Sequence, residues 1–311
     1  FGELLPVIDK GVKASTKASR ERAIFKLFGN GINTARDDWV TDFDAGKLKD
    51  KVEFFLDEYR RHRQDSPDLG TVIKWSRNLK VKLARGMAED FDRALLIRYA
   101  YRPFLPQFGY LSRLMIDELG QWPAFDGPGN RSLNFPAGKV FTCLASALPT
   151  DFHFTGDTKT VALYRFDDGQ RHDNITDWAL KQFTSHYKAG PGKRLPEPSK
   201  EGIFHYVYAA LHDPLYRDKY ALNLKREFPR IPLYGLLRAD VWRWADWGRQ
   251  LMDLHIGYEQ VEPWPLQRQD TPDEKARAAG QAPKCLLKSE PEPGRIVIDS
   301  ETTLSGVPAE A

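Results

Sequence analysis

Two stretches of this 311-residue sequence combine basic side chains with aromatic rings and contain no acidic residue: 74–85 and 93–113. Lys and Arg side chains neutralise phosphates, Arg can also pair with guanine, and aromatic faces can stack on unpaired bases. The pattern therefore indicates a nucleic-acid surface, but a solvated helix face followed by a core strand would give the same pattern. The DNA-binding candidates in these stretches are Lys74, Arg77, Lys80, Lys82, Arg85, Arg98, Arg102 and Arg113.

Several segments resemble catalytic motifs but lack residues that the chemistry needs. The segment 213–216 (Asp-Pro-Leu-Tyr) lacks the second proline of the Asp-Pro-Pro-Tyr motif of amino-methyltransferases, and it fits a helix cap followed by proline. The basic loop 190–194 lacks the spacing and the Ser or Thr of a phosphate-binding loop. The seven histidines are scattered without the spacing of metal ligands. We therefore expect no complete catalytic site and no metal site.

Composition limits the class of protein. Hydrophobic residues make up 41% and charged residues 29%, which is typical of a globular protein. A net charge of +3 does not by itself indicate nucleic acid, so any DNA surface must come from local clustering. Two distant cysteines exclude a disulfide framework, and no apolar run approaches the roughly 20 residues that span a bilayer. We expect a cytoplasmic protein without a membrane partner. Because the chain begins with Phe and stops after an expected strand, we also expect a fragment.

The elements that must position the basic residues are mostly helical by their apolar periodicity. The first helix carries Val52, Phe55, Leu56 and Tyr59 on one stripe. Short alternating or aromatic runs between turns predict strands, and the polar segment 267–283 is typical of a loose linker. The fold class predicted is α+β, a mainly helical body with a small mixed or antiparallel β section. The expected helices are 47–63, 72–85, 175–187, 200–211, 214–228 and 240–255, and the expected strands include 94–101, 139–144, 160–166 and 295–299.

Several long runs resemble one known family. They include NGINTARDDWV at 30–40, YRPF at 101–104, NITDWAL at 174–180, IFHYVYAALHDP at 203–214 and YRDKYALNLKREFPRIP at 216–232. These runs are similar to the C-terminal specificity region of type ISP restriction-modification enzymes. Residues 114–160 match the family poorly, as expected for base-contacting loops that set each enzyme's target.

The resemblance implies a larger bacterial enzyme of phage defence. Such an enzyme joins a nuclease, an ATP-driven translocase, an adenine N6-methyltransferase and a target-recognition domain, and it uses S-adenosylmethionine, ATP and magnesium. The catalytic Asn-Pro-Pro-Tyr and translocase motifs have no match here, so we expect no cofactor site in this chain. The implied parts are the methyltransferase end and junction (1–46), an α+β recognition part (47–170), a helical scaffold (171–266) and a linker with a final strand (267–311).

The function expected from residues and resemblance together is sequence-specific recognition of double-stranded DNA. Basic side chains would fix the register on phosphates, and loops within 107–160 and 167–174 would enter the major groove. The loop candidates are Arg131, Arg171 and His172, and Arg36 near the junction is a further candidate, with a plain junction turn as an equal alternative. The competing hypothesis is a docking module that couples the methyltransferase and the translocase, other domains of the same polypeptide, without reading bases.

Overall fold

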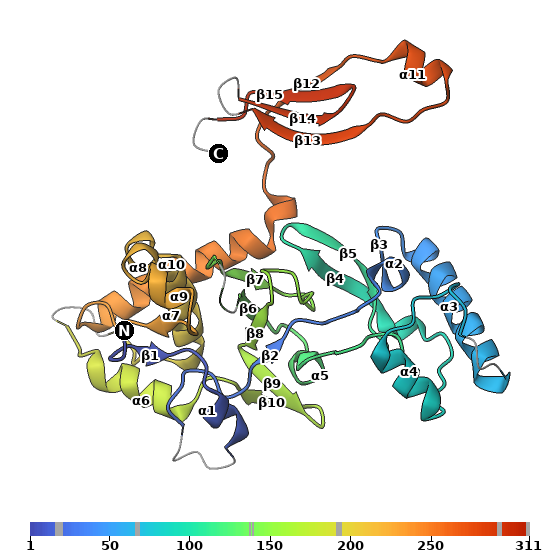
Figure 1. Cartoon of the computed structure of the whole chain (residues 1–311). Coiled ribbons are helices and arrows are strands. Elements are labelled where there is room, and N and C mark those ends of the chain that lie inside the picture. The colour runs from blue at the N-terminus through green and yellow to red at the C-terminus, as the bar shows by residue number, and fades with distance from the viewer. Residues whose placement is uncertain are drawn as a thin grey trace. The chain divides into compact units, whose positions relative to one another are not determined.

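A computed structural model describes residues 1–15, 21–65, 69–136, 138, 140–190, 195–290 and 294–308 (Figure 1). The chain divides into two compact units, unit 1 (1–258) and unit 2 (259–311). Within the described ranges, no helix is both long enough and apolar enough to cross a membrane.

The fold is α+β, but the prediction of a mainly helical body is wrong. Among the described residues, helices account for 35% and strands for 24%, and these strands form five small sheets. Many strands have only two to four residues, such as β2 (Gly29–Asn30), β3 (Thr41–Asp42) and β7 (Leu144–Ser146). Strands this short show almost no alternation of apolar and polar residues in the sequence. Each is a strand because it pairs with a segment far away in the sequence.

One core of unit 1 lies between an antiparallel sheet and helices. The sheet has the order β2-β8-β6-β7, with β6 (Ser132–Phe135) and β8 (Lys159–Ala162) paired so that Leu133 faces Val161 across the strands. Helix α7 (Lys200–His212) is buried at every residue from Gly202 to Leu211. It packs closely against α10 (Arg238–Ile256), because a Cβ on Gly248 would lie 1.9 Å from the carbonyl oxygen of His205. Helix α6 (Asp177–His186) contributes Ala179 and Phe183 to the same core.

A second core in unit 1 supports the first basic stretch. It lies between the sheet β3-β5-β4 and the helices α3 (Ala45–Asp65) and α4 (Arg77–Ala84). Strand β4 (Leu96–Arg102) confirms the predicted strand at 94–101, and it pairs with β5 (Leu105–Tyr110). The predicted stripe of α3 is confirmed, since Val52, Phe55, Leu56 and Tyr59 are all at most 2% exposed.

Smaller elements complete unit 1. The expected helix 214–228 is two shorter helices, which meet at Tyr220. Strands β9 and β10 form a separate hairpin that follows the central sheet of unit 1, β2-β8-β6-β7. The bounds are β1 (Leu5–Pro6), α1 (Lys10–Ala14), α2 (Asp37–Val40), α5 (Trp122–Phe125), β9 (Tyr164–Asp167), β10 (Gln170–Asp173), α8 (Pro214–Lys219), α9 (Ala221–Leu224) and β11 (Arg230–Ile231).

Unit 2 is a four-stranded antiparallel sheet with one short helix. The strand order is β12-β15-β14-β13. The prediction of a loose linker at 267–283 is wrong, because this segment contains β12 and α11; their polar, exposed residues hide the periodicity that would identify them. The bounds are β12 (Gln267–Asp270), α11 (Glu274–Ala278), β13 (Cys285–Glu290), β14 (Arg295–Asp299) and β15 (Thr302–Ser305). The functional division at residues 46, 170 and 266 stays a prediction.

Candidate nucleic-acid interface

Helix α4 turns most of its basic residues toward solvent. Ser76 caps the helix, because its Oγ accepts a hydrogen bond from Leu79 N over 3.1 Å. Leu79 is fully buried, whereas Arg77, Lys80 and Arg85 are exposed. The helical period places Arg77 on the side opposite Leu79, with Lys80 and the C-cap residue Arg85 on the two flanks of that side.

Lys82 differs from its neighbours because it points toward the protein. Its ammonium group donates hydrogen bonds to the carbonyl oxygens of Leu114 (3.2 Å) and Ile116 (2.6 Å). Burial lowers the pKa of Lys82. Lys82 therefore holds the segment after β5 against α4. This inward position does not fit the predicted role of Lys82 as a phosphate contact.

Arg36, the candidate near the junction, is a buried structural residue with 1% of its surface exposed. Its guanidinium donates to Asp117 Oδ1 over 2.8 Å and to Ser76 Oγ over 2.6 Å, and it also contacts the carbonyl oxygen of Met115. Burial lowers the pKa of Arg36, and the carboxylate of Asp117 opposes this effect. The alternative of a junction turn fits the structure, so Arg36 is excluded as a direct DNA contact.

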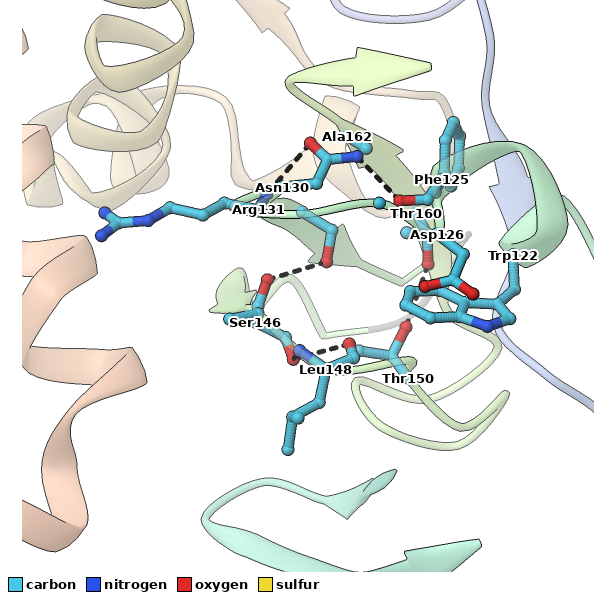
Figure 2. A pocket seen from close by; sticks show the side chains of 13 residues that line it. Trp122, Phe125, Asp126, Asn130, Arg131, Ser146, Leu148, Thr150, Thr160 and Ala162 are labelled. Carbon is cyan, nitrogen blue, oxygen red and sulfur yellow. Dashed lines mark hydrogen bonds between the residues drawn. The ribbon is translucent and has the colours of Figure 1, made fainter. Parts of the chain in front are cut away.

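Two further candidates form ion pairs within unit 1. Arg102 donates to Asp151 Oδ1 over 2.7 Å, and its guanidinium lies 3.8 Å from the ring centroid of Tyr101. Arg131 pairs with Asp253 on α10 over 2.6 Å, and Figure 2 shows its side chain directed away from the neighbouring pocket residues. The side chain of Arg131 is about one-third exposed. The carboxylate of Asp253 already compensates part of the positive charge that Arg131 could offer to a phosphate.

The remaining basic candidates lie at the surface. Arg98 is exposed, with its guanidinium 5.5 Å from the ring centroid of Phe108. Five candidates are exposed and form no ion pair with any residue that the structure describes: Lys74, Arg77, Lys80, Arg85 and Arg113. By contrast, basic residues on neighbouring α3 are paired with local acids: Lys49 with Glu53, Arg60 with Asp57 and Arg61 with Glu58. Residues 74–85 include no Asp or Glu, so their basic side chains have no acid nearby in the sequence to pair with.

The β9–β10 hairpin separates the two candidates that are neighbours in sequence. Arg171 lies opposite Phe166, and His172 lies opposite Arg165, so the two candidates are on opposite faces. Sequence reasoning missed Arg165 and Gln170, which share a face with His172. The turn at Asp168 and Gly169 was recognisable from the sequence, and it would have given the register that identifies them.

A pocket of about 70 Å³ lies between α5 and the central sheet (Figure 2). Two of its polar side chains, Thr150 and Thr160, already donate hydrogen bonds within the protein, both to Asn134 Oδ1, over 3.0 and 2.8 Å. In the described part of the chain, no group of His, Cys, Asp and Glu side chains could hold a metal ion.

A larger, open hollow of about 320 Å³ lies beside the loop after β2. Asp151 at its edge accepts a hydrogen bond from Tyr99 Oη over 2.7 Å, and burial raises the pKa of this carboxyl. Lys74, Asp37 and Asp38 also line this hollow.

Comparisons with known proteins assign the chain to a family. The family model of the type ISP C-terminal specificity domain matches residues 23–311. A cryo-EM structure of a DrdV–DNA complex shares 37% identity at a TM-score of 0.87, over 99% of this chain and 32% of that chain. A nuclease-deletion mutant of the type ISP enzyme LlaGI with a DNA substrate mimic shares 23% identity at a TM-score of 0.74, over 98% of this chain and 23% of that chain.

DNA-bound LlaBIII, an ATP-dependent type ISP enzyme, shares 20% identity at a TM-score of 0.79, over 100% of this chain and 20% of that chain. At these identities, the LlaGI and LlaBIII structures show a shared fold alone. No curated protein matches the sequence. The chain spans about a third of the DrdV chain. With the family model matching most of its length, the chain belongs to the type ISP C-terminal specificity domain family.

Proposed function

We propose that this chain recognises a specific sequence of double-stranded DNA as the specificity part of a type ISP restriction-modification enzyme. Membership of the specificity-domain family supports this proposal, and so does the likeness to a DrdV–DNA complex at 37% identity. The observation that carries it is the exposed basic face of α4, where Arg77, Lys80 and Arg85 have no carboxylate partner among the described residues.

The face of α4 suits a phosphate backbone because its cations remain free to exchange counterions for phosphates. Lys74 precedes the helix and Arg113 lies next to Leu114, the residue whose carbonyl binds Lys82. Lys82 and Arg36 fix α4 from its inner side through contacts with the segment after β5. The outer cations would therefore meet DNA from a preorganised helix, which lowers the entropy lost on binding.

The rest of the enzyme would lie outside this chain, which spans about a third of the DrdV chain. In our proposal, recognition directs adenine N6 methylation and ATP-dependent cleavage by other domains of the same polypeptide. Those domains would bind S-adenosylmethionine, ATP and magnesium, in a bacterial enzyme that acts against phage DNA in the cytoplasm. The residues of this chain would bind and position the duplex for them.

The salt dependence of duplex binding tests this proposal against the docking module. A chain that contacts several phosphates loses affinity steeply as salt rises, by about 0.9 units in the logarithm of the binding constant per phosphate and per tenfold salt. Fluorescence anisotropy with a labelled duplex pool would measure this slope. Binding that weakens steeply with salt supports DNA recognition. An absence of duplex binding at low salt would overturn it and favour the docking module.

A further inference from the structure

The hairpin formed by β9 and β10 is a two-stranded ribbon outside the central sheet (Figure 1). Its turn has positive φ at both central residues, Asp168 (46°) and Gly169 (76°). This conformation matches the natural twist of a hairpin and makes a tight, two-residue tip. The ribbon therefore presents a narrow end whose strand register is fixed by the turn.

Two buried asparagines hold the base of the hairpin in place. Asn130 donates through Nδ2 to the carbonyl oxygen of Tyr164 over 2.9 Å and accepts from Tyr164 N over 3.0 Å. Asn174 donates through Nδ2 to the carbonyl oxygen of Ala162, also over 2.9 Å, and its backbone N–H donates to Leu163 O. Clamped strands of this kind lose little entropy when the ribbon meets a ligand.

The two faces of the ribbon differ in what they contact. Pairs directly opposite each other share a face, so Phe166 and Arg171 lie together, on the same side as Tyr164. The ring of Phe166 packs against Gly127, where a Cβ would lie 2.2 Å from Phe166 Cζ. Arg171 lies over the ring of Tyr164, 4.5 Å from its centroid. This is the packing face of the hairpin, because its rings are in contact with the protein.

The opposite face carries only polar side chains. It consists of Arg165, Asp167, Gln170 and His172, and the register places Arg165 opposite His172 and Asp167 opposite Gln170. Asp167 and Gln170 are exposed at the tip, whereas Arg165 and His172 are half-buried nearer the base. Nε of Arg165 is buried without a hydrogen-bond partner in the structure. A buried donor without a partner costs free energy, so this side chain is held in place by packing and not by a hydrogen bond of its Nε.

We infer that this polar face, Arg165, Asp167, Gln170 and His172, enters the major groove and reads base edges. The inference rests on the proposed DNA-binding function and adds to it the element and side chains that set the target sequence. The major groove, about 12 Å wide, admits a two-stranded β-ribbon. An aromatic packing face and a polar outer face give such a ribbon a fixed orientation in the groove.

The residue types match the donor and acceptor patterns of bases. Arg165 can donate two parallel hydrogen bonds to guanine O6 and N7, and Gln170 can bind adenine N6 and N7. Asp167 can accept a hydrogen bond from cytosine N4. Asp167 also disfavours the alternative in which the tip lies on the phosphate backbone, because a carboxylate and a phosphate repel each other.

Selection of bound duplexes from a randomised pool tests this assignment on the full chain. The variants are Gln170→Ala at the exposed tip and Arg165→Gln nearer the base. Two controls remove a cation elsewhere: Arg171→Gln on the packing face and Arg243→Gln on the exposed side of α10. We expect each test variant to lose preference at one or two positions of the selected motif, by about 5- to 150-fold, and to keep its affinity for duplexes without the motif. Both controls should keep the wild-type motif.

Three results would overturn the assignment. The first is a motif that stays unchanged in both test variants, and the second is a uniform loss of affinity for all duplexes, which would place the ribbon on phosphates. The third is a wild-type chain that binds duplexes but enriches no motif. If the wild-type chain binds no duplex at all, the proposed function fails as well. Because Gln170 is exposed, its variant stays informative if Arg165→Gln fails to fold.

Discussion

The guanidinium of Arg36 donates a hydrogen bond to the carboxylate of Asp117 over 2.8 Å, from a side chain that has no exposed surface. The two residues are far apart in sequence, and Ser76 lies between them, accepting from Arg36 and donating to Asp117 over 2.7 Å. Three segments therefore meet at one charged contact: the loop after β2, the start of α4 and the segment after β5. This contact fixes the position of the helix that carries the exposed cations.

Replacing Arg36 with Met should destabilise unit 1, because it leaves Asp117 half-buried without its charge partner. Breaking a buried ion pair typically costs about 3–5 kcal/mol of unfolding free energy. Urea unfolding followed by circular dichroism would measure the loss. The control is Arg61→Met, since Arg61 is 76% exposed and pairs with Glu58 on the surface. Exposed pairs contribute about 0–1 kcal/mol. Equal losses in the two variants would contradict a structural role for Arg36.

Removing the exposed cations of α4 should weaken duplex binding and flatten its salt dependence. The variant Arg77→Gln, Lys80→Gln, Arg85→Gln should lower the salt slope by up to about 2.7 units, if each side chain contacts one phosphate. The matched control removes the same charge from α3, where the cations are paired with acids: Lys49→Gln, Arg60→Gln, Arg61→Gln. Anisotropy titrations over a range of salt concentrations would measure both slopes. If both variants have the same salt slope, the change comes from the lower net charge and not from contacts between α4 and phosphates.

The half-buried His212 should make the fold sensitive to acid. Its Nδ1 lies 2.8 Å from the carbonyl oxygen of Tyr208, and its Nε2 lies 2.9 Å from that of Cys143. Burial lowers the pKa of His212 to about 4, and the positive charge of Arg217 adds to this effect. The unfolded chain binds the proton more readily, so stability is fully present above pH 6.5 and is lost as the pH falls toward 4.

The expected loss from His212 alone is about 3 kcal/mol between pH 6.5 and 4. Urea unfolding at several pH values would show a shallower decline for His212→Gln than for the wild type. Carboxylates also titrate in this range, but they are common to both proteins and cancel in the comparison. His153→Gln, at an exposed histidine, serves as the control. A wild-type decline that His212→Gln leaves unaltered would exclude His212 as its source.

The sequence predicted where the basic side chains lie along the chain, but it could not show which of them reach solvent. Arg77, Lys80 and Lys82 look alike in an acid-free helix, and Lys82 turns inward because of carbonyl oxygens 32 and 34 residues away. Arg36 is buried for a similar reason, since its carboxylate partner is 81 residues away. Such contacts depend on the packing of distant segments, and no local pattern indicates them.

Part of the geometry of the hairpin follows from local sequence. The turn at Asp168 and Gly169 fixes which residues share a face, so the grouping of Arg165 with His172 follows from the sequence. Which face packs against the protein does not follow, because it depends on Gly127 lying under Phe166. The many strands of two to four residues were missed for a related reason, because pairing partners far along the chain define them.

The ratio of two dissociation constants tests sequence-specific recognition most directly. A duplex carrying the motif selected by the chain is compared with a scrambled duplex of the same length and composition, at physiological salt. Sequence-specific proteins bind their sites at least about 1,000-fold more tightly than other DNA. We predict a ratio of this size for the isolated chain. A ratio near one, with measurable binding to both duplexes, would contradict the account, because binding would then come from phosphate contacts alone.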